Sequence, residues 1–439
     1  MLKIERFLQP KFLLTAMILL QTLWLILGWA LAYKYDYVPS LQNPYKMSFI
    51  IAFTLVVGLI IIYLPTQVLS RMRQIKAYLL KNQMHLLLVL GAIVLIVAGI
   101  YINNLRWGSD EEAFFNAAMI MVEKVEFFEA YAQTWMARQH PPLPHIVTGF
   151  FMQIFGDDLF IMRFVVTLIG IATVLLIYFI GCELYDRYTG FLAALCLLSL
   201  PRFLQHSTVV AGNDIFITFF FTLAVFLLIR LQSHPSYWLS IKTGVAIGMG
   251  LLSKYTMILI YPMLLSLLFF KKYQLKTLIF HLGIISLISM SLLGIWLVIA
   301  NDMGLLSTQS QRLVFHAGLE QDDGVPSLFS WWRVQYRLKA LFIEIPSALG
   351  VYNIPLLLLG GLTLVRKRSQ SDWFILLWIA VVFVPIMLIL PDNRYFMPAF
   401  PALAIAMAHG VRLIPSVIEQ TVVLALLYSM STLYLFVRF

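Results

Sequence analysis

Runs of about twenty apolar residues, separated by short polar segments, recur from one end of the chain to the other. A helix of that length crosses the roughly 30 Å of hydrocarbon in a bilayer, where only helices and closed barrels satisfy their own backbone hydrogen bonds. The pattern therefore predicts an all-α, polytopic bundle of about thirteen transmembrane helices. The expected spans are 12–33, 47–69, 84–103, 158–181, 188–202, 212–231, 237–252, 255–270, 277–300, 346–365, 372–390, 396–411 and 415–436.

The composition supports a membrane protein. Of the 439 residues, 61% are hydrophobic and 12% are charged, whereas a soluble domain is about a quarter charged. A net charge of +10 would suggest a nucleic-acid partner in a soluble protein. Here Lys and Arg gather in short loops, so we expect contact with membrane lipids and no nucleic-acid partner.

The basic loops predict the orientation. They fall on one side of the membrane if the chain has about thirteen spans, and cytoplasmic loops are enriched in Lys and Arg. We therefore expect a multi-pass protein of the cell (plasma) membrane with a cytoplasmic N-terminus. The basic residues on that side are Lys3, Arg6, Lys11, Arg71, Arg73, Lys76, Lys81, Arg187, Arg230, Lys271, Lys272, Lys276, Arg366, Lys367, Arg368 and Arg412.

Two long loops, about 104–157 and 301–345, are expected on the opposite, extracytoplasmic side. The first of them is mainly acidic, which fits an outside location. Long loops on one face of a rigid scaffold are where binding and catalysis usually occur. We therefore expect the functional site on this side.

The first long loop begins with the acidic cluster Asp110, Glu111 and Glu112. A local interpretation is a capping box formed by Ser109 and Glu112 ahead of an interfacial helix over 113–122. A functional interpretation is compatible with it, because a helix start at the membrane surface holds a carboxylate in a fixed place. Such a carboxylate could accept a proton from an acceptor hydroxyl during group transfer.

Other polar residues lie near the same side. His140, followed by two prolines, predicts a stiff turn into the helix that begins near Ile146. His140 and His145 could bind a metal, although the intervening prolines disfavour shared ligation. Asp214 follows Asn213 at a helix start, where an N-cap is the local explanation. Lys254 interrupts a long apolar segment, and either it snorkels to water or it binds an anionic lipid headgroup.

Arg394 departs from the positive-inside pattern, because the segment around it is expected on the outer face. A salt bridge to Asp392 or another neighbour would explain it locally. A guanidinium that faces the outer side also suits a phosphate, which it can bind with two hydrogen bonds. Arg337 in the second long loop is a further candidate for the same role, together with Arg333 and Lys339.

The order of these motifs resembles that of the GT-C superfamily of membrane glycosyltransferases. The nearest likeness is to glycosyltransferase family 39, the protein O-mannosyltransferases, and to the related lipid A aminoarabinose transferases. The resemblance rests on residues about 100 to 410, namely Asp110-Glu111, His140-Pro141-Pro142-Leu143, Asn213-Asp214, the segment Gly250 to Thr256, and Arg394-Tyr395 with Pro398 and Pro401.

The resemblance implies a helical bundle with a cavity that opens outward and toward the lipid. It implies that Asp110 is the catalytic base, with Glu111 and Asp214 in the catalytic set. It also implies that Lys254 and Arg394 contact the lipid phosphate of the donor. His140, Tyr395 and Arg337 complete the predicted donor-binding residues. No cofactor is required, although a divalent metal could assist.

The sequence departs from the family pattern in several places. Residues 1–83 are expected to form two additional transmembrane helices ahead of a GT-C-like domain over 84–439, and no soluble carbohydrate-binding domain is expected after the last helix. The residue before Pro141 is His140, where the aminoarabinose branch has a lysine. The sugar therefore remains open.

The expected function is inverting transfer of a monosaccharide from a polyprenyl-phosphate donor to an acceptor hydroxyl on the extracytoplasmic face. The acceptor could be a lipid, a glycan or a protein. The alternative is a lipid-sugar flippase or another secondary transporter, because many helices and intramembrane charge fit that class too. A catalytically inactive scaffold of the same fold is a third possibility.

Overall fold

The computed structural model describes residues 110–431, with gaps at 124–126, 209–211, 267–274, 318–329, 390, 417–418, 421–422 and 429. The predicted spans 12–33, 47–69 and 84–103, and with them the two additional helices over 1–83, lie outside the described residues. So do Ser109 and part of the predicted span 415–436.

The regular elements that the described part forms are all helical, as predicted. In chain order they are α8 Glu111–Glu123, α9 Phe127–Ala132, α10 Leu143–Phe155, α11 Leu159–Leu184, α12 Arg187–Leu198, α13 Pro201–His206, α14 Asn213–Ser233, α15 Tyr237–Leu251, the 3-10 helix η1 Tyr255–Ile260, α16 Tyr261–Leu264, α18 Leu275–Asp302, α19 Leu305–Ala317, α20 Trp331–Lys339, the π-helix η2 Ala340–Glu344, α21 Ile345–Leu349, the 3-10 helix η3 Val351–Asn353, α22 Ile354–Lys367, α23 Gln370–Ile389, the 3-10 helix η4 Met397–Ala399 and α24 Phe400–Arg412.

Within this part, four helices are long and apolar enough to cross a membrane, namely Leu159–Leu184, Asn213–Ser233, Lys276–Asp302 and Gln370–Ile389. A fifth span is possible in the pair Arg333–Leu349 and Val351–Lys367, which is bent by 86°. The protein is therefore a multi-pass membrane protein. The total of about thirteen spans stays a prediction.

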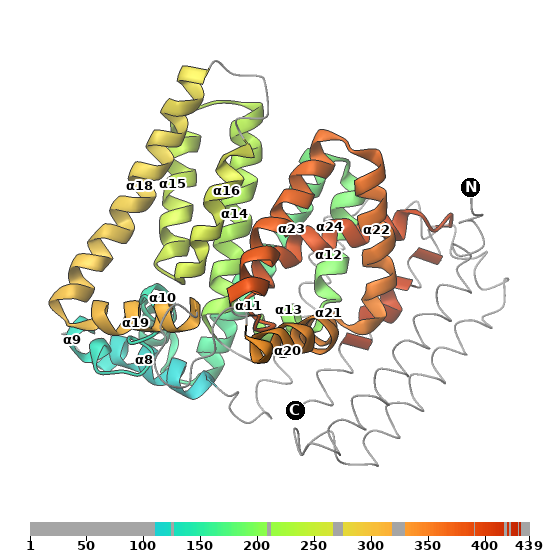
Figure 1. Ribbon diagram of the computed structural model, residues 1–439. Helices are drawn as coiled ribbons and strands as arrows, with labels where there is room; N and C mark the ends of the chain where they lie inside the picture. Colours follow the sequence, from blue (N-terminus) through green and yellow to red (C-terminus); the bar gives the residue numbers. More distant parts are fainter. Residues whose placement is uncertain are drawn as a thin grey trace, which may run out of the picture.

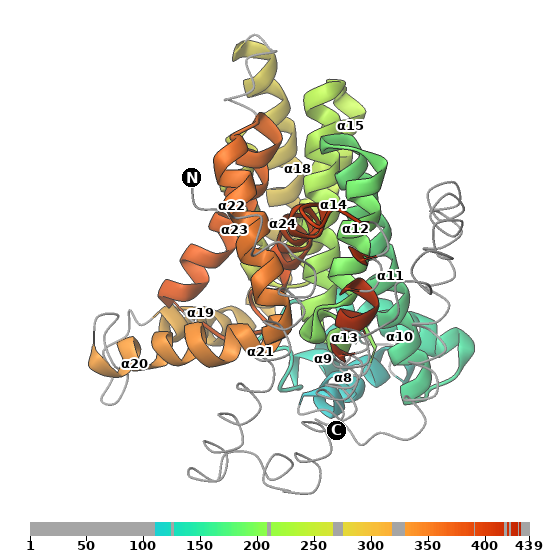
Figure 2. The same ribbon diagram turned by 90° about the vertical axis from the view of Figure 1, so that its right-hand side faces the viewer.

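The long helices run side by side, and the segments that connect them lie at the two ends of the bundle (Figure 1). One end carries the short turns after α11, α14 and α22, and basic residues such as Arg187, Arg230 and Arg366 lie in the helices beside these turns. The other end carries α8, α9, α10 and α19, which belong to the two predicted long loops. Both views show α19 and α20 lying across the bundle at this end (Figures 1 and 2).

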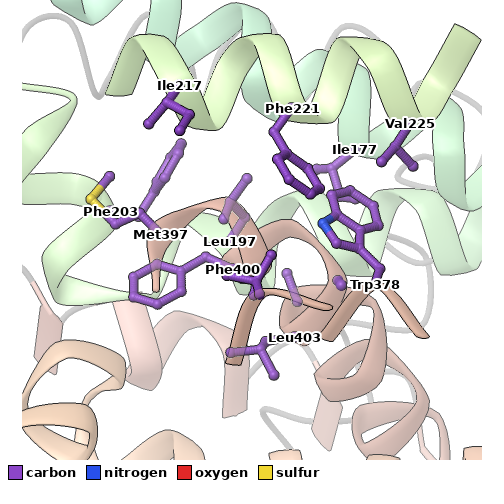
Figure 3. Packing of buried hydrophobic residues seen from close by; sticks show 14 of the residues in the cluster. Ile177, Leu197, Phe203, Ile217, Phe221, Val225, Trp378, Met397, Phe400 and Leu403 are labelled. Carbon is purple, nitrogen blue, oxygen red and sulfur yellow. The ribbon is translucent and has the colours of Figure 1, made fainter. Parts of the chain in front are cut away.

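Helix α14 lies at the centre of the core. Figure 3 shows its residues Ile217, Phe221 and Val225 facing side chains from α11, α12, α13, α23 and α24. Trp378 of α23 stacks on Phe221 with ring centroids 6.1 Å apart, and its indole N–H donates to the Pro398 carbonyl at 2.9 Å. Because a rigid core holds α14, the polar residues at its start have a fixed place.

Glycines allow some helix pairs to approach closely, as is common in membrane bundles. A Cβ atom added to Gly360 of α22 would lie 1.7 Å from the Ala406 carbonyl oxygen of α24, and one added to Gly410 would lie 2.2 Å from the Leu356 carbonyl oxygen. The backbones of α22 and α24 are therefore in direct contact. This contact fixes α24, which begins shortly after the segment that carries Arg394.

Candidate functional site

Asp110 and Arg394 form an ion pair at the end of the bundle that carries the long loops. Arg394 Nη1 donates to Asp110 Oδ2, which joins the start of α8 to the 391–396 segment. Arg394 Nε also donates to Asp392 Oδ2 at 3.3 Å, and about a third of each of the three side chains is exposed. Burial would lower the pKa of Arg394, but the charges of Asp214 and Asp392 and the Asp110 bond together raise it.

Lys254 and Asp214 form a second, buried pair. Lys254 lies between the end of α15 and the start of η1. Its backbone is extended, which interrupts the helical conformation at this point. Its Nζ donates to Asp214 Oδ1 at 2.5 Å, and both side chains are less than one-tenth exposed. Lys254 therefore does not snorkel, and Asp214 is not the N-cap of α14, because Gly212 occupies that position without a side-chain cap bond.

His206 at the end of α13 lies beside the same carboxylate. Its Nδ1 is 3.9 Å from Asp214 Oδ2, which is too long for a hydrogen bond. Burial, reinforced by the nearby Arg202 cation, lowers the pKa of His206 to about 3. The imidazole is therefore neutral at physiological pH.

Tyr395 connects the two pairs. Its ring lies under Lys254 Nζ, 4.0 Å from the ring centroid, and the neighbouring Arg394 Cζ is 5.8 Å from the same centroid. Cations at these distances from an aromatic face are attracted to it. The structure thus brings Asp110, Asp214, Lys254, Arg394 and Tyr395, all predicted site residues, into one cluster.

The turn that begins at His140 is held against this cluster. The Leu143 N–H donates to the Leu252 carbonyl at 3.2 Å, which ties the turn to the end of α15, and Pro142 precedes α10 as predicted. The Tyr131 hydroxyl donates to the His140 carbonyl at 3.0 Å. Burial first, and then the nearby Lys254 cation, lower the pKa of His140 well below its usual value, so the ring is a neutral hydrogen-bonding group.

Glu111 lies in a different environment from Asp110. It accepts two hydrogen bonds from Arg163 of α11, at 2.7 Å from Nε and 2.6 Å from Nη2, and both side chains are completely buried. This contact fixes the start of α8 to the bundle. Glu111 therefore holds the neighbouring Asp110 in place through its bonds to Arg163. Glu112, in contrast, is exposed on the first turn of the same helix.

Arg337 does not join the cluster. Its Nη2 donates to the Leu388 carbonyl at 2.6 Å, and Arg333 Nη1 donates to the Ile389 carbonyl at 2.9 Å. Both arginines thus bind the carboxyl end of α23, where a cation is favourable. The predicted salt bridge between Arg394 and Asp392 is confirmed, and the contact with Asp110 is additional.

Sequence reasoning did not single out Arg163, His206 or the environment of Asn393. Arg163 had a readable signal, because an arginine within an apolar helix is costly and needs a partner. His206 had none, since a histidine near a helix end is common. Among the described residues, no group of three or more His, Cys, Asp or Glu side chains is arranged to hold a metal ion.

Solved structures share this fold. One of them is ArnT from Cupriavidus metallidurans bound to undecaprenyl phosphate. The alignment covers 74% of this chain and 60% of the ArnT chain, with a TM-score of 0.54 and 16% identity. The Archaeoglobus fulgidus oligosaccharyltransferase in the apo form aligns over 80% of this chain and 56% of its own, with a TM-score of 0.52 and 13% identity. The chain thus spans about three-fifths of these proteins. No curated protein sequence matches it significantly.

The chain is therefore a multi-pass membrane protein whose fold resembles that of ArnT and of the archaeal oligosaccharyltransferase. A more particular resemblance comes from the sequence. Residues 139–296 match the family described as dolichyl-phosphate-mannose-protein mannosyltransferase, so the predicted resemblance to this family is confirmed. The matched range contains His140, Asp214 and Lys254, whereas Asp110 and Arg394 lie outside it.

Proposed function

We propose that this protein is an inverting glycosyltransferase that moves a monosaccharide, a hexosyl or pentosyl unit, from a polyprenyl-phosphate donor to an acceptor hydroxyl. The observation that carries this proposal is the contact of the partly exposed Asp110 and Arg394 beside the buried Lys254. A carboxylate and two cations in one place are what attack by a hydroxyl and departure of a phosphate require.

In this mechanism the acceptor oxygen attacks the anomeric carbon as Asp110 takes its proton. The bond from that carbon to the phosphate oxygen breaks on the opposite side, and its electron pair leaves with polyprenyl phosphate. Arg394 and Lys254 stabilise the growing negative charge on the phosphate. A single displacement inverts the anomeric configuration, and the scheme needs no cofactor.

The ion pair between Asp110 and Arg394 fits this order of events. A phosphate is a bidentate partner for a guanidinium, so donor binding would exchange Arg394 from carboxylate to phosphate. That exchange releases Asp110 to face the acceptor. Glu111 and Asp214 act indirectly in this scheme, because Glu111 holds the start of α8 and Asp214 holds Lys254. His140 and Tyr395 complete the donor's surroundings.

We infer an extracytoplasmic site with the N-terminus in the cytoplasm. The site lies at the end of the bundle that carries the long loops, and the turns flanked by Arg187, Arg230 and Arg366 lie at the other end (Figure 1). Cytoplasmic loops are the ones enriched in Lys and Arg. The comparisons support a lipid-linked ligand, since related folds were solved with undecaprenyl phosphate and with dolichol-phosphate.

The test is turnover by the purified protein in detergent, with radiolabelled polyprenyl-phosphate sugars and extracted membrane acceptors. Asp110→Asn keeps an oxygen that Arg394 can bind but removes the base, so transfer should fall by on the order of 10²–10⁴-fold. Glu112→Gln, on the exposed first turn of α8, is the matched control and should retain wild-type transfer.

Two outcomes would refute the proposal. Near-full transfer by Asp110→Asn would remove Asp110 as the base. An absence of transfer by the wild type across the donor panel, with labelled donor crossing the bilayer of reconstituted vesicles instead, would establish a lipid-sugar flippase.

A further inference from the structure

The 391–396 segment carries Arg394 into the site, and its backbone is held by local bonds. The Arg394 N–H donates to Asp392 Oδ1 at 3.1 Å, and the Met397 N–H donates to the Arg394 carbonyl at 3.2 Å. These bonds shape the segment. They do not by themselves fix it relative to the helices around it.

Asn393 supplies that connection. It is 6% exposed, and both ends of its side-chain amide are used. Its Oδ1 accepts a hydrogen bond from Arg202 Nη2 of α13, and its Nδ2 donates to Glu344 Oε2 of η2 at 2.8 Å. One amide therefore joins the 391–396 segment to a helix on each side.

Both of these helices belong to the neighbourhood of the site. Helix α13 ends at His206, which lies beside Asp214, so the same short helix bonds Asn393 through Arg202 and lies next to the pair of Lys254 and Asp214. The π-helix η2 follows α20 at the end of the second long loop, and π-helices occur often at functional sites. On η2, Phe342 is 68% exposed while Glu344 reaches Asn393 and also pairs with Lys339 at 3.6 Å.

We propose that Asn393 is a positioning residue for Arg394: by bridging Arg202 and Glu344 it holds the guanidinium at the place where the donor phosphate leaves. This inference rests on the proposed glycosyl transfer. Asn393 touches no reacting atom, and it acts through the residue that follows it in the chain. A displacement of a catalytic group by about 1 Å can lower a rate by on the order of 10²-fold.

The hydrogen bond from Asn393 to Glu344 can be reversed by exchanging which of the two side chains donates. Asn393→Asp keeps the acceptor for Arg202 but loses the donor and sets two carboxylates against each other, so kcat should fall by on the order of 10²-fold. Glu344→Gln keeps an acceptor for Asn393 and is the matched control, with near wild-type kcat. The double variant Asn393→Asp with Glu344→Gln reverses the donor and acceptor and should recover kcat to within a few-fold of the wild type.

A second comparison separates positioning from a merely structural role. Asn393→Asp is also made in an Arg394→Gln background, where kcat with the same radiolabelled donors should not fall further, because the residue it positions is gone. In the wild-type background KM for the acceptor should stay unchanged while kcat falls. Thermal unfolding in detergent should show that all variants remain folded.

The results have distinct meanings. If Asn393→Asp lowered kcat in the Arg394→Gln background by the same factor as in the wild type, the positioning role would be wrong. A failure of Glu344→Gln to rescue Asn393→Asp would have the same meaning. Either result would leave the proposed glycosyl transfer untouched. A wild-type protein without transfer would overturn the proposed function itself.

Discussion

The buried pair of Glu111 and Arg163 gives the sharpest prediction about how α8 is held. Arg163→Met removes the guanidinium that donates two hydrogen bonds to the Glu111 carboxylate and leaves that carboxylate in a completely buried position. Methionine is flexible and fills irregular space, so the change removes charge with little other disturbance. The start of α8 would then lose its bond to α11.

The magnitude follows from the burial. Both side chains are fully buried and joined by two short bonds, at 2.7 and 2.6 Å, so solvent does not screen the loss. Breaking a buried pair by removing one partner costs about 3–5 kcal/mol. Replacing both partners by apolar residues of similar volume is often neutral or stabilising by about 1–4 kcal/mol. Arg163→Met should therefore destabilise the protein, and Arg163→Met with Glu111→Leu should recover the loss.

The assay is unfolding in detergent, followed by circular dichroism, together with transfer by each folded variant. If Glu111 is an anchor, the double variant recovers stability and keeps most transfer. An Arg163→Met protein as stable as the wild type would refute the argument from burial. A stable double variant without transfer would show that Glu111 acts on the substrate and belongs with Asp110 in the catalytic set.

Two further predictions concern pH and helix contact. Burial lowers the pKa of His145 to about 3, whereas the unfolded chain binds that proton near pH 6.5, so the free energy of unfolding should fall as the pH drops from about 6.5 toward 3. His145→Phe should reduce that slope by up to about 1.4 kcal/mol per pH unit in urea titrations, and an unchanged slope would refute the assignment. Gly360→Ala places a Cβ against the α24 backbone and should cost about 1–3 kcal/mol in detergent unfolding, whereas Gly361→Ala meets nothing within 4 Å and should be neutral. Equal effects of the two alanines would contradict the close contact of α22 and α24.

Apolar periodicity could predict the helices of the described part well. Spans 158–181, 212–231, 277–300 and 372–390 correspond to α11, α14, α18 and α23, within a few residues at most ends. The pattern could not distinguish continuous from broken helices. The predicted span 255–270 contains the short helices η1 and α16, because a run of apolar residues does not reveal where Pro262 or a neighbouring helix interrupts an α-helix.

Most members of the charged cluster could be singled out from the sequence, but their contacts could not. Asp110, Lys254 and Arg394 could be singled out because charge at membrane depth is costly and needs a reason. Which carboxylate pairs with which cation depends on how α8, α14 and the 391–396 segment meet, and local spacing carries no such information. For the same reason the sequence offers Arg337 as a further, less specific candidate beside Arg394, although it binds the end of α23.

The two ion pairs of the site differ in a way that suits a phosphate-releasing reaction. Lys254 and Asp214 are almost completely buried, so their separation would leave an unpaired charge in the protein interior. Asp110 and Arg394 are each about one-third exposed, so water and an incoming phosphate can replace either partner at low cost. The buried pair would hold the Lys254 ammonium in a fixed place throughout the proposed reaction. In the proposed mechanism the exposed pair opens when the donor arrives, which would present a guanidinium to the phosphate and a free carboxylate to the acceptor in the same step.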